Sequence, residues 1–306
     1  MKNIVVQIGS LLSNCLIALI VVYFIYMWIR NRYLLSVSFR NVFRNIRRSL
    51  ITIIAISIGA ISIIIFGGYI NDMFYGLRES TIRSQIGHLQ LYKKGFNDFG
   101  VVDPQKYKLH NFSEIIEVLQ EDKELSDKIE TILPVVEFSG LVSTGDKTAN
   151  FMGRGVDIEA DRSLSSYDYI KDGQKLEIGD RGKACLGNLL AKSIGAGVDT
   201  SVMLLVSTSG LGFNAIDVDV KGTTESFSAD YDKVLLKINI EDTFSLLGER
   251  SIDRLIILLK DSKDLDFVTK RINILNEKNN MDLEMKNWEE LAIYYKQVKN
   301  MYSRTF

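Results

Sequence analysis

The chain has 306 residues, of which 46% are hydrophobic and 25% charged, which excludes a disordered, collagen-like or disulfide-rich protein. Its 37 basic and 38 acidic residues nearly cancel, but the two signs are unevenly placed. No acidic residue precedes Asp72, whereas Lys2 and six arginines do. A basic, apolar N-terminal quarter followed by an acidic remainder indicates a membrane protein.

The first uncharged apolar run covers about residues 11–29, which at about 1.5 Å per residue is long enough to cross a bilayer. Tyr23, Tyr26 and Trp28 lie near its far end, and such residues are enriched at membrane interfaces. A cleaved signal peptide is the alternative, but the run is followed directly by Arg30 and Arg32 and lacks a small-residue cleavage site. We therefore expect residues 1–29 to form an extra, uncleaved transmembrane helix.

The second uncharged run covers about residues 50–70 and is also long enough to span a bilayer. Ala55 and Gly59 have the spacing at which small residues let helices approach closely in lipid, although small residues are also common in such spans. Apolar residues continue at a spacing of three to four beyond this run. We predict one helix over 50–82, a transmembrane span followed by a stalk, with Ala55 and Gly59 in helix packing.

The segment between the two runs, residues 30–49, contains six arginines and no acid, so the positive-inside rule places it in the cytoplasm. Its apolar residues and its arginines fall on separate arcs of a helix, which predicts an amphipathic helix in the membrane interface. The candidate interface residues are Arg40, Arg44, Arg47 and Arg48. Their partners are either lipid phosphates, with a role in topology, or a docking surface on another protein.

Residues 83–300 are predicted to form an outer domain of mixed α/β structure, so that the whole chain is of the α+β class. The predicted strands are residues 86–92, 132–142, 148–156, 202–206, 216–223, 234–238, 255–260 and 283–285. The predicted helices are residues 113–128, 186–194, 241–247, 264–278 and one from 287 onward, with 161–182 irregular. Two lobes fit this order best, one from about 80–155 and the C-terminal alternating part, the other inserted at about 157–235.

The sequence offers little for catalysis. It contains no GxxxxGK[ST] phosphate loop, so nucleotide binding of that kind is excluded. His88 is expected to be a structural residue of a strand and Cys185 a small buried residue, and neither has metal-binding partners at a suitable spacing. Asp217 and Asp219 alternate along one strand, which favours a solvated strand face. We predict no catalytic, metal or cofactor site, no nucleic-acid partner and no enzymatic activity.

Several segments, in this order, resemble one family of membrane proteins. They are LLSVSFRNVFRNIRRSLITIIAISIGAISIII, NDMFYGLRESTIRSQIGHLQLYKKGF with its Gly87-His88 pair, Gly153–Asp157, Cys185–Gly195, Val220–Gly222 and Asn287-Trp288. From about Leu34 onward the chain resembles the N-terminal part of permease subunits of the MacB- and FtsX-like ABC transporter family, especially the lipoprotein-releasing permeases. Residues 1–29 have no counterpart in this pattern.

The resemblance implies a multi-pass protein of the cell inner membrane with a large MacB-like periplasmic core domain outside the cytoplasm. It implies as partners a separate ABC ATPase subunit, a second permease subunit in a homo- or heterodimer, the lipid bilayer, and lipoprotein or another lipophilic cargo. Residues 301–306 lie where the second transmembrane helix of these permeases would begin. We therefore expect a fragment, a truncated product or half of a split permease. The alternative function is a membrane-anchored scaffold or sensor that regulates an envelope partner without transport.

Overall fold

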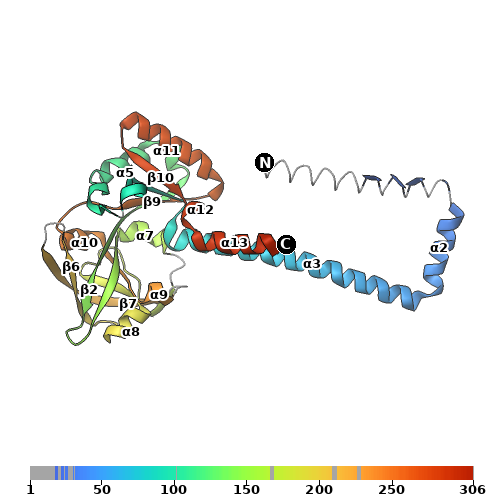
Figure 1. Cartoon of the computed structure of the whole chain (residues 1–306), viewed down its shortest axis with the longest axis horizontal. Helices are drawn as coiled ribbons and strands as arrows, with labels where there is room; N and C mark the ends of the chain where they lie inside the picture. Colours follow the sequence, from blue (N-terminus) through green and yellow to red (C-terminus); the bar gives the residue numbers. More distant parts are fainter. Residues whose placement is uncertain are drawn as a thin grey trace. The chain divides into compact units, whose positions relative to one another are not determined.

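The structure is a computed structural model that describes residues 18–19, 22–23, 25–26, 30, 32–100, 102–165, 169–208, 212–225 and 229–305. The chain divides into two compact units, Met1–Met73 and Phe74–Phe306, and the second is called the body below (Figure 1). The expected transmembrane helix at residues 1–29 falls largely outside the described residues, so it stays a prediction.

The predicted amphipathic helix of residues 30–49 is shorter than expected, because the chain turns at Asn45. Helix α2 covers Arg32–Arg44 and helix α3 covers Ile46–Thr81. Asparagine is favoured where helices start, and the Asn45 carbonyl accepts the backbone N–H of Ser49 at 3.1 Å. Arg47 and Arg48 therefore lie in the first turn of α3, and the boundary expected at residues 49 and 50 between the interfacial and transmembrane segments stays a prediction.

Helix α3 is the one described helix that is long and apolar enough to cross a membrane. None of its residues is buried, and isoleucines all around it are more than half exposed, as at Ile51, Ile56 and Ile63. A helix that is apolar on every side is typical of a membrane span, because lipid covers the faces that the protein does not. The prediction of a span that continues as a stalk agrees with this single helix.

The described residues of the body form ten strands with helices between them. The strands are β1 (Leu89–Lys93), β2 (Ile129–Ser143), β3 (Thr148–Val156), β4 (Tyr169–Gly173), β5 (Lys183–Gly187), β6 (Ser201–Ser207), β7 (Phe213–Glu225), β8 (Leu235–Asn239), β9 (Arg254–Leu259) and β10 (Leu283–Asn287). The α-helices are α4 (Phe96–Phe99), α5 (Phe112–Glu121), α6 (Lys123–Ser126), α7 (Ile158–Leu164), α8 (Asn188–Ile194), α9 (Ala229–Asp232), α10 (Ile240–Leu247), α11 (Leu265–Asn279), α12 (Trp288–Leu291) and α13 (Ile293–Thr305). Shorter turns are the π-helix η1 (Ile82–Ile86) and the 3-10 helices η2 (Pro104–Tyr107) and η3 (Ser262–Asp264).

Part of the sheet closes on itself into a barrel. The pairing runs β2-β3-β8-β5-β7, and β6 pairs with both β7 and β2, which completes a ring of six strands. Val142, Leu204 and Val218 are buried in the interior of this ring. Helices α8 and α10 add Leu190 and Leu246 to the same core. A closed ring of strands has no free edges. A barrel of few strands is narrow, so side chains of the strands fill its interior, and the two helices complete the same core.

The rest of the sheet is open and has the order β10-β1-β9-β2. Every residue of β9 is buried, because both of its faces are covered. Leu255 and Ile257 face a core with α5 and α11, whereas Ile256 and Leu258 face a core with η1, α12 and α13. Figure 1 shows α5 and α11 at the end of the body opposite α8. Strand β2 belongs to both regions, since its first half pairs with β9 and its second half with β6.

Several predicted elements agree with the structure, and others do not. The strand at 148–156 is confirmed without change as β3. The single helix predicted at 113–128 is wrong, because Asp122 follows the end of α5 and its side chain accepts the backbone N–H groups of Glu124 and Leu125 to start α6. Residues 161–182 are not wholly irregular, since they include the end of α7 and the short strand β4. The residues predicted to begin the strand at 86 instead end a π-helix.

The division into two lobes is not confirmed as predicted. The barrel is not confined to an insertion at 157–235, because it also takes the second half of β2, all of β3 and β8 as far as Asn239. The body is one compact unit whose two regions share β2. The boundary expected at residue 301 also falls inside a continuous helix, α13.

Candidate coupling site at the stalk junction

The end of the stalk helix enters the body through a π-helical turn. Gly87 closes this turn by donating its N–H to the Ile82 carbonyl at 2.8 Å. Its φ of +68° lies in the region that favours glycine, and a Cβ there would stand 2.3 Å from Ile256 Cγ2. Single π-helical turns at helix ends are frequent at functional sites. A glycine at this point allows the helix to end directly against β9.

His88 connects the junction to three separate segments. Its backbone N–H donates to the Ile257 carbonyl at 2.8 Å, and its carbonyl accepts the Trp288 N–H at 3.0 Å. Its Nδ1 accepts the Leu259 N–H at 3.1 Å, so the ring proton is on Nε2, which donates to Ser262 Oγ at 2.8 Å. Burial lowers the pKa of His88 to about 4. The prediction of a structural histidine is confirmed, but its position between stalk, β9 and α12 was not foreseen.

The C-terminal helices return to the same place. Trp288 and Tyr295 are buried, and their rings meet edge to face with centroids 5.0 Å apart. Phe74 of the stalk packs edge to face on Tyr295 at 6.3 Å and on Tyr302 at 5.5 Å. Ile82 is fully buried in this cluster. The last turns of α3 are therefore held by α12 and α13 as well as by the sheet.

An ion-pair cluster lies beside the apolar contacts. Arg83 Nε is 3.3 Å from Glu79 Oε2, and its Nη1 is 3.2 Å from Glu130 Oε2 on β2. Burial lowers the pKa of Arg83, but Glu130 and Glu79 outweigh it and the net pKa is raised. Arg83 therefore joins the stalk to β2, the strand that continues into the barrel.

A second charged cluster stands where β2 passes from the open region to the barrel. Arg254 of β9 is buried and pairs with Glu137 of β2, whose carboxylate also lies 3.7 Å from Arg154 of β3. Burial raises the pKa of Glu137, but Arg254 and Arg154 dominate and lower it to about 2. Asp253 accepts the Glu137 backbone N–H at 2.6 Å, and burial raises the pKa of Asp253. These charges fix β2 at the point shared by the two regions.

The predicted interface residues all lie in the first compact unit. Arg40 and Arg44 are on α2, and Arg47 and Arg48 are in the first turn of α3; all four are exposed. Ala55 and Gly59 are exposed on α3, and a Cβ added at Gly59 would meet no atom within 4 Å. The turn at Asn45 separates the arginines into two pairs. Their roles in lipid contact, ATPase docking and helix packing stay predictions.

The remaining chemistry of the described residues is structural. Cys185 is buried, its Sγ lies 3.6 Å from the Gln174 carbonyl, and burial raises the pKa of its thiol to about 11. Asp217 and Asp219 are exposed on β7, as a solvated strand face requires. Among the described ranges, no group of three or more His, Cys, Asp or Glu side chains could hold a metal ion.

An apolar helix of bilayer length followed by a mixed α/β body is typical of a membrane protein with a large domain at one side of the membrane. Residues 49–275 match the family described as the MacB-like periplasmic core domain, and the chain belongs to that family. Membership places the body outside the cytoplasm and confirms the predicted resemblance to MacB- and FtsX-like permeases. The lipoprotein-releasing subgroup is not confirmed.

Two solved structures are similar to this chain. The periplasmic region of MacB from Actinobacillus actinomycetemcomitans is 14% identical, with a TM-score of 0.52 over 72% of this chain and 96% of that one. The extracellular domain of YknZ, a noncanonical ABC-type transporter from Gram-positive bacteria, is 9% identical, with a TM-score of 0.48 over 65% of this chain and 99% of that one. At such identity the MacB likeness shows the fold alone. No curated protein matches the chain.

Proposed function

We propose that the chain is the permease subunit, or the N-terminal part of one, of an ABC transporter of the inner membrane. In this proposal a separate ATPase moves the membrane helices, and the stalk carries that movement to the body, which releases or exports a lipophilic substrate such as a lipoprotein. The observation that carries the proposal is the junction: α3 is one helix from Ile46 to Thr81, and its end is held by Gly87, His88 and Trp288.

The way in which the junction is built supports transmission of movement. The π-helix η1, which directly follows α3, touches β9 through Ile82 and β2 through the Arg83–Glu130 ion pair. Both strands belong to the sheet, and β2 continues into the barrel. A shift of the stalk therefore acts on an element that reaches both regions of the body, and the barrel and the open region would move as two lobes about β2.

The proposal assigns the remaining roles as follows. ATP hydrolysis belongs to the partner subunit, since this sequence has no phosphate loop. Arg40, Arg44, Arg47 and Arg48 face lipid phosphates or that ATPase, because no acid lies near them in sequence. Ala55 and Gly59 form the contact with further membrane helices of the same or a second permease subunit. The complete assembly is multi-pass.

A reversible lock at the junction tests the proposal. Phe74→Cys and Tyr302→Cys, at side chains whose ring centroids lie 5.5 Å apart, would join the stalk to α13 when they are oxidised in the presence of a short dithiol that forms a disulfide with each cysteine. The double variant is made in a chain in which Cys15 is serine and is assembled with its ATPase in liposomes. We expect the oxidised form to hydrolyse ATP but to lose substrate release, and reduction to restore release.

Each single-cysteine variant, treated with the same oxidant, serves as the control and should keep both activities. Undiminished ATP-dependent release by the fully oxidised double variant would contradict transmission through the junction. If the chain neither binds an ATPase nor supports release in its reduced form, the scaffold or sensor function takes the place of transport.

A further inference from the structure

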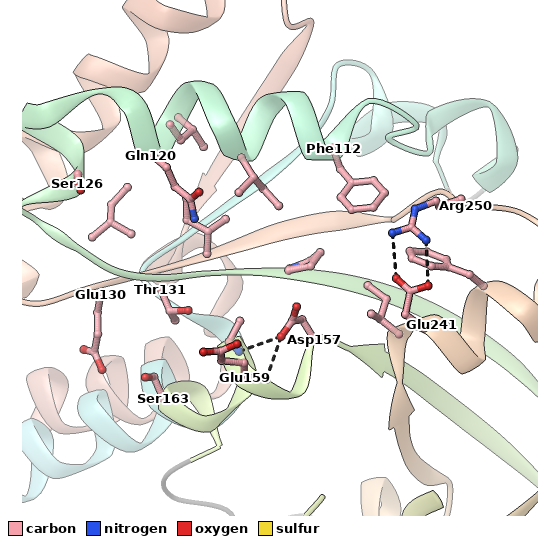
Figure 2. Close-up of a pocket in the computed structure, with 18 of the residues that line it drawn as sticks. Phe112, Gln120, Ser126, Glu130, Thr131, Asp157, Glu159, Ser163, Glu241 and Arg250 are labelled. Atoms are coloured by element: carbon pink, nitrogen blue, oxygen red, sulfur yellow. Dashed lines mark hydrogen bonds and ion pairs between the residues drawn. The ribbon is translucent and has the colours of Figure 1, made fainter. Parts of the chain in front are cut away.

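A cavity of about 690 Å³ opens on the body between the barrel and the open region. Figure 2 shows α5 on one side of it, the first half of β2 across its middle and α7 on the other side. The first turn of α10 and Arg250 close one end. None of these residues belongs to the stalk junction except Glu130, so the cavity is a separate feature of the body.

The wall along β2 is an edge that is protected against strand pairing. Residues 129–134 pair only with β9, because β3 pairs with β2 from Val135 onward. The register shifts between Ile129 and Thr131, and Pro134, which has no N–H, lies in this half of the strand. Bulges and prolines are the devices that keep an edge from adding another strand. A molecule in the cavity would therefore be recognised by side chains and not by β-pairing.

One end of the cavity already holds a cation. Arg250 Nη1 and Nη2 each donate to a carboxylate oxygen of Glu241 at 2.9 Å. The same guanidinium lies over the Phe244 ring, 5.0 Å from its centroid. A carboxylate with an aromatic face beside it is a favourable site for an arginine or lysine head group. At this end, a carboxylate and an aromatic ring together bind a positively charged side chain of the protein itself.

Beside α7, the cavity is lined by the carboxylates of Asp157 and Glu159. Asp157 accepts the N–H groups of Glu159 and Ala160 through Oδ1 alone, at 2.9 and 3.1 Å. In the described part of the chain no basic side chain lies within ion-pair distance of Asp157 or Glu159. Figure 2 shows both carboxylates apart from the Glu241–Arg250 pair. Apolar side chains of α5 and β2, including Ile116 and Ile129, line the same cavity.

We propose that this cavity binds a basic, partly apolar peptide segment of an extracytoplasmic partner protein. A lysine or arginine of the segment places its charged head at Asp157 and Glu159 and its aliphatic stem on Ile116 and Ile129. Four acids and two cations line the cavity: Glu130, Asp157, Glu159, Glu241, Arg250 and Lys260. Arg250 pairs with Glu241, Glu130 pairs with Arg83, and Lys260 donates to the Asp127 carbonyl at 3.0 Å. The two acids beside α7 are left without an ion pair among the described residues, and charge complementarity therefore favours a basic segment. The proposal does not rest on transport, since binding requires neither an ATPase nor a cargo.

The test uses the full chain in nanodiscs of phosphatidylcholine, which carry no net lipid charge, and a short fluorescein-labelled peptide of alternating leucine and lysine. The pocket variant is Asp157→Asn with Glu159→Gln, in which asparagine keeps the helix cap. The matched control is Asp217→Asn with Asp219→Asn, which removes the same charge from exposed positions on β7. A second pocket variant, Ser163→Lys, places a tethered cation on α7 beside the acids.

We expect fluorescence anisotropy to show binding that both pocket variants weaken about fivefold or more and that the control leaves unchanged. The same peptide with glutamate for lysine should not bind. Circular dichroism and thermal melting establish that each variant is folded. Equal weakening by the pocket variant and the control would overturn the proposal, because it would show a general attraction to an acidic body. Absence of binding to the wild-type chain would overturn it as well.

Discussion

The barrel and the open region of the body obtain their order in different ways. The barrel closes on itself, so its core of Val142, Leu204 and Val218 is enclosed by a ring of strands from one stretch of chain. The open region pairs β1 with β9 and β10, which come from the far end of the sequence. Its two faces are covered by separate elements, one of which is the stalk junction.

In the proposed function, the barrel is the region that keeps its shape, and the open region is the one that responds to movement of the stalk. The stalk junction contacts β9 and β2 directly. The barrel is connected to the open region by β2, by the Glu137–Arg254 pair and by helix α10, which places Phe244 in the open-region core and Leu246 in the barrel core. In the proposed function, the open region therefore holds the contacts on which the stalk acts, and the barrel is moved as a unit. Matched substitutions in the two regions test this difference.

The largest effect is expected from cavities in the two cores. Leu258→Ala in the open region and Leu204→Ala in the barrel each remove a fully buried side chain, and each should lower the free energy of unfolding by about 2–5 kcal/mol. Hydrogen exchange should rise around η1 and α12 in the first variant and around β6 and β7 in the second. Identical exchange maps would show that the two regions do not open separately.

A smaller but more local effect is expected at Gly87. Gly87→Ala combines a φ of +68° with a Cβ at 2.3 Å from Ile256 Cγ2, and should cost about 2–4 kcal/mol by thermal or chemical unfolding. Gly145→Ala is the matched control, because its φ is +92° but no atom lies within 4 Å of the added Cβ. The control should cost only about 1 kcal/mol. Equal costs would mean that the close approach to β9 is unimportant.

The lowered pKa of His88 should make the free energy of unfolding depend on pH. Its folded pKa of about 4 lies below the ordinary 6.5, so the unfolded chain binds more protons between these values. Stability therefore falls as the pH drops through this window, by up to about 3 kcal/mol from this group. His88→Asn keeps an acceptor for the Leu259 N–H and should lose this part of the slope. Urea unfolding at intervals between the two pH values measures it, and parallel curves for both proteins would contradict the assignment.

The smallest effect is expected at the exposed edge of the junction. Arg83→Gln removes the ion pairs with Glu79 and Glu130 and should lower stability by less than about 1 kcal/mol, because these groups are partly exposed. The effect should fade at high salt. Lys233→Gln, which breaks an exposed pair with Asp230 on the barrel side, is the control. A large, salt-independent loss in Arg83→Gln would indicate a packing role instead.

Local chemistry made much of the fold predictable. Thr148–Val156 alternates and follows a Gly-Asp turn, and the predicted strand matches β3 at both ends. The helix ending at Gly195 matches α8, because glycine readily adopts the left-handed conformation found there. β5 was missed because Lys183–Gly187 is a short buried run without alternation and leads straight into that helix. The pairing of β6 with β2 has no local signal, since it joins segments about sixty residues apart, so the barrel could not be predicted.

The site was harder to predict than the fold. Charge alone located Arg40, Arg44, Arg47 and Arg48, and the structure adds only that a turn divides them. The Gly87-His88 pair was noticed through its resemblance to a family, but its function as a connection was not, because the partners Leu259, Ser262 and Trp288 are remote in sequence. A glycine and a buried polar residue placed directly after a long helix are the signal that points to such a junction.

The strand order also decides when each region can form during synthesis. Every strand of the barrel is complete once residue 239 has emerged, whereas β1 finds its partner only when β9 begins at Arg254. Because chains are made from the N-terminus, the stalk helix exists well before the strands that receive it. Until then both edges of β1 lack a partner strand, and unpaired strand edges favour aggregation. The nascent protein must therefore be protected at its junction for longer than at its barrel.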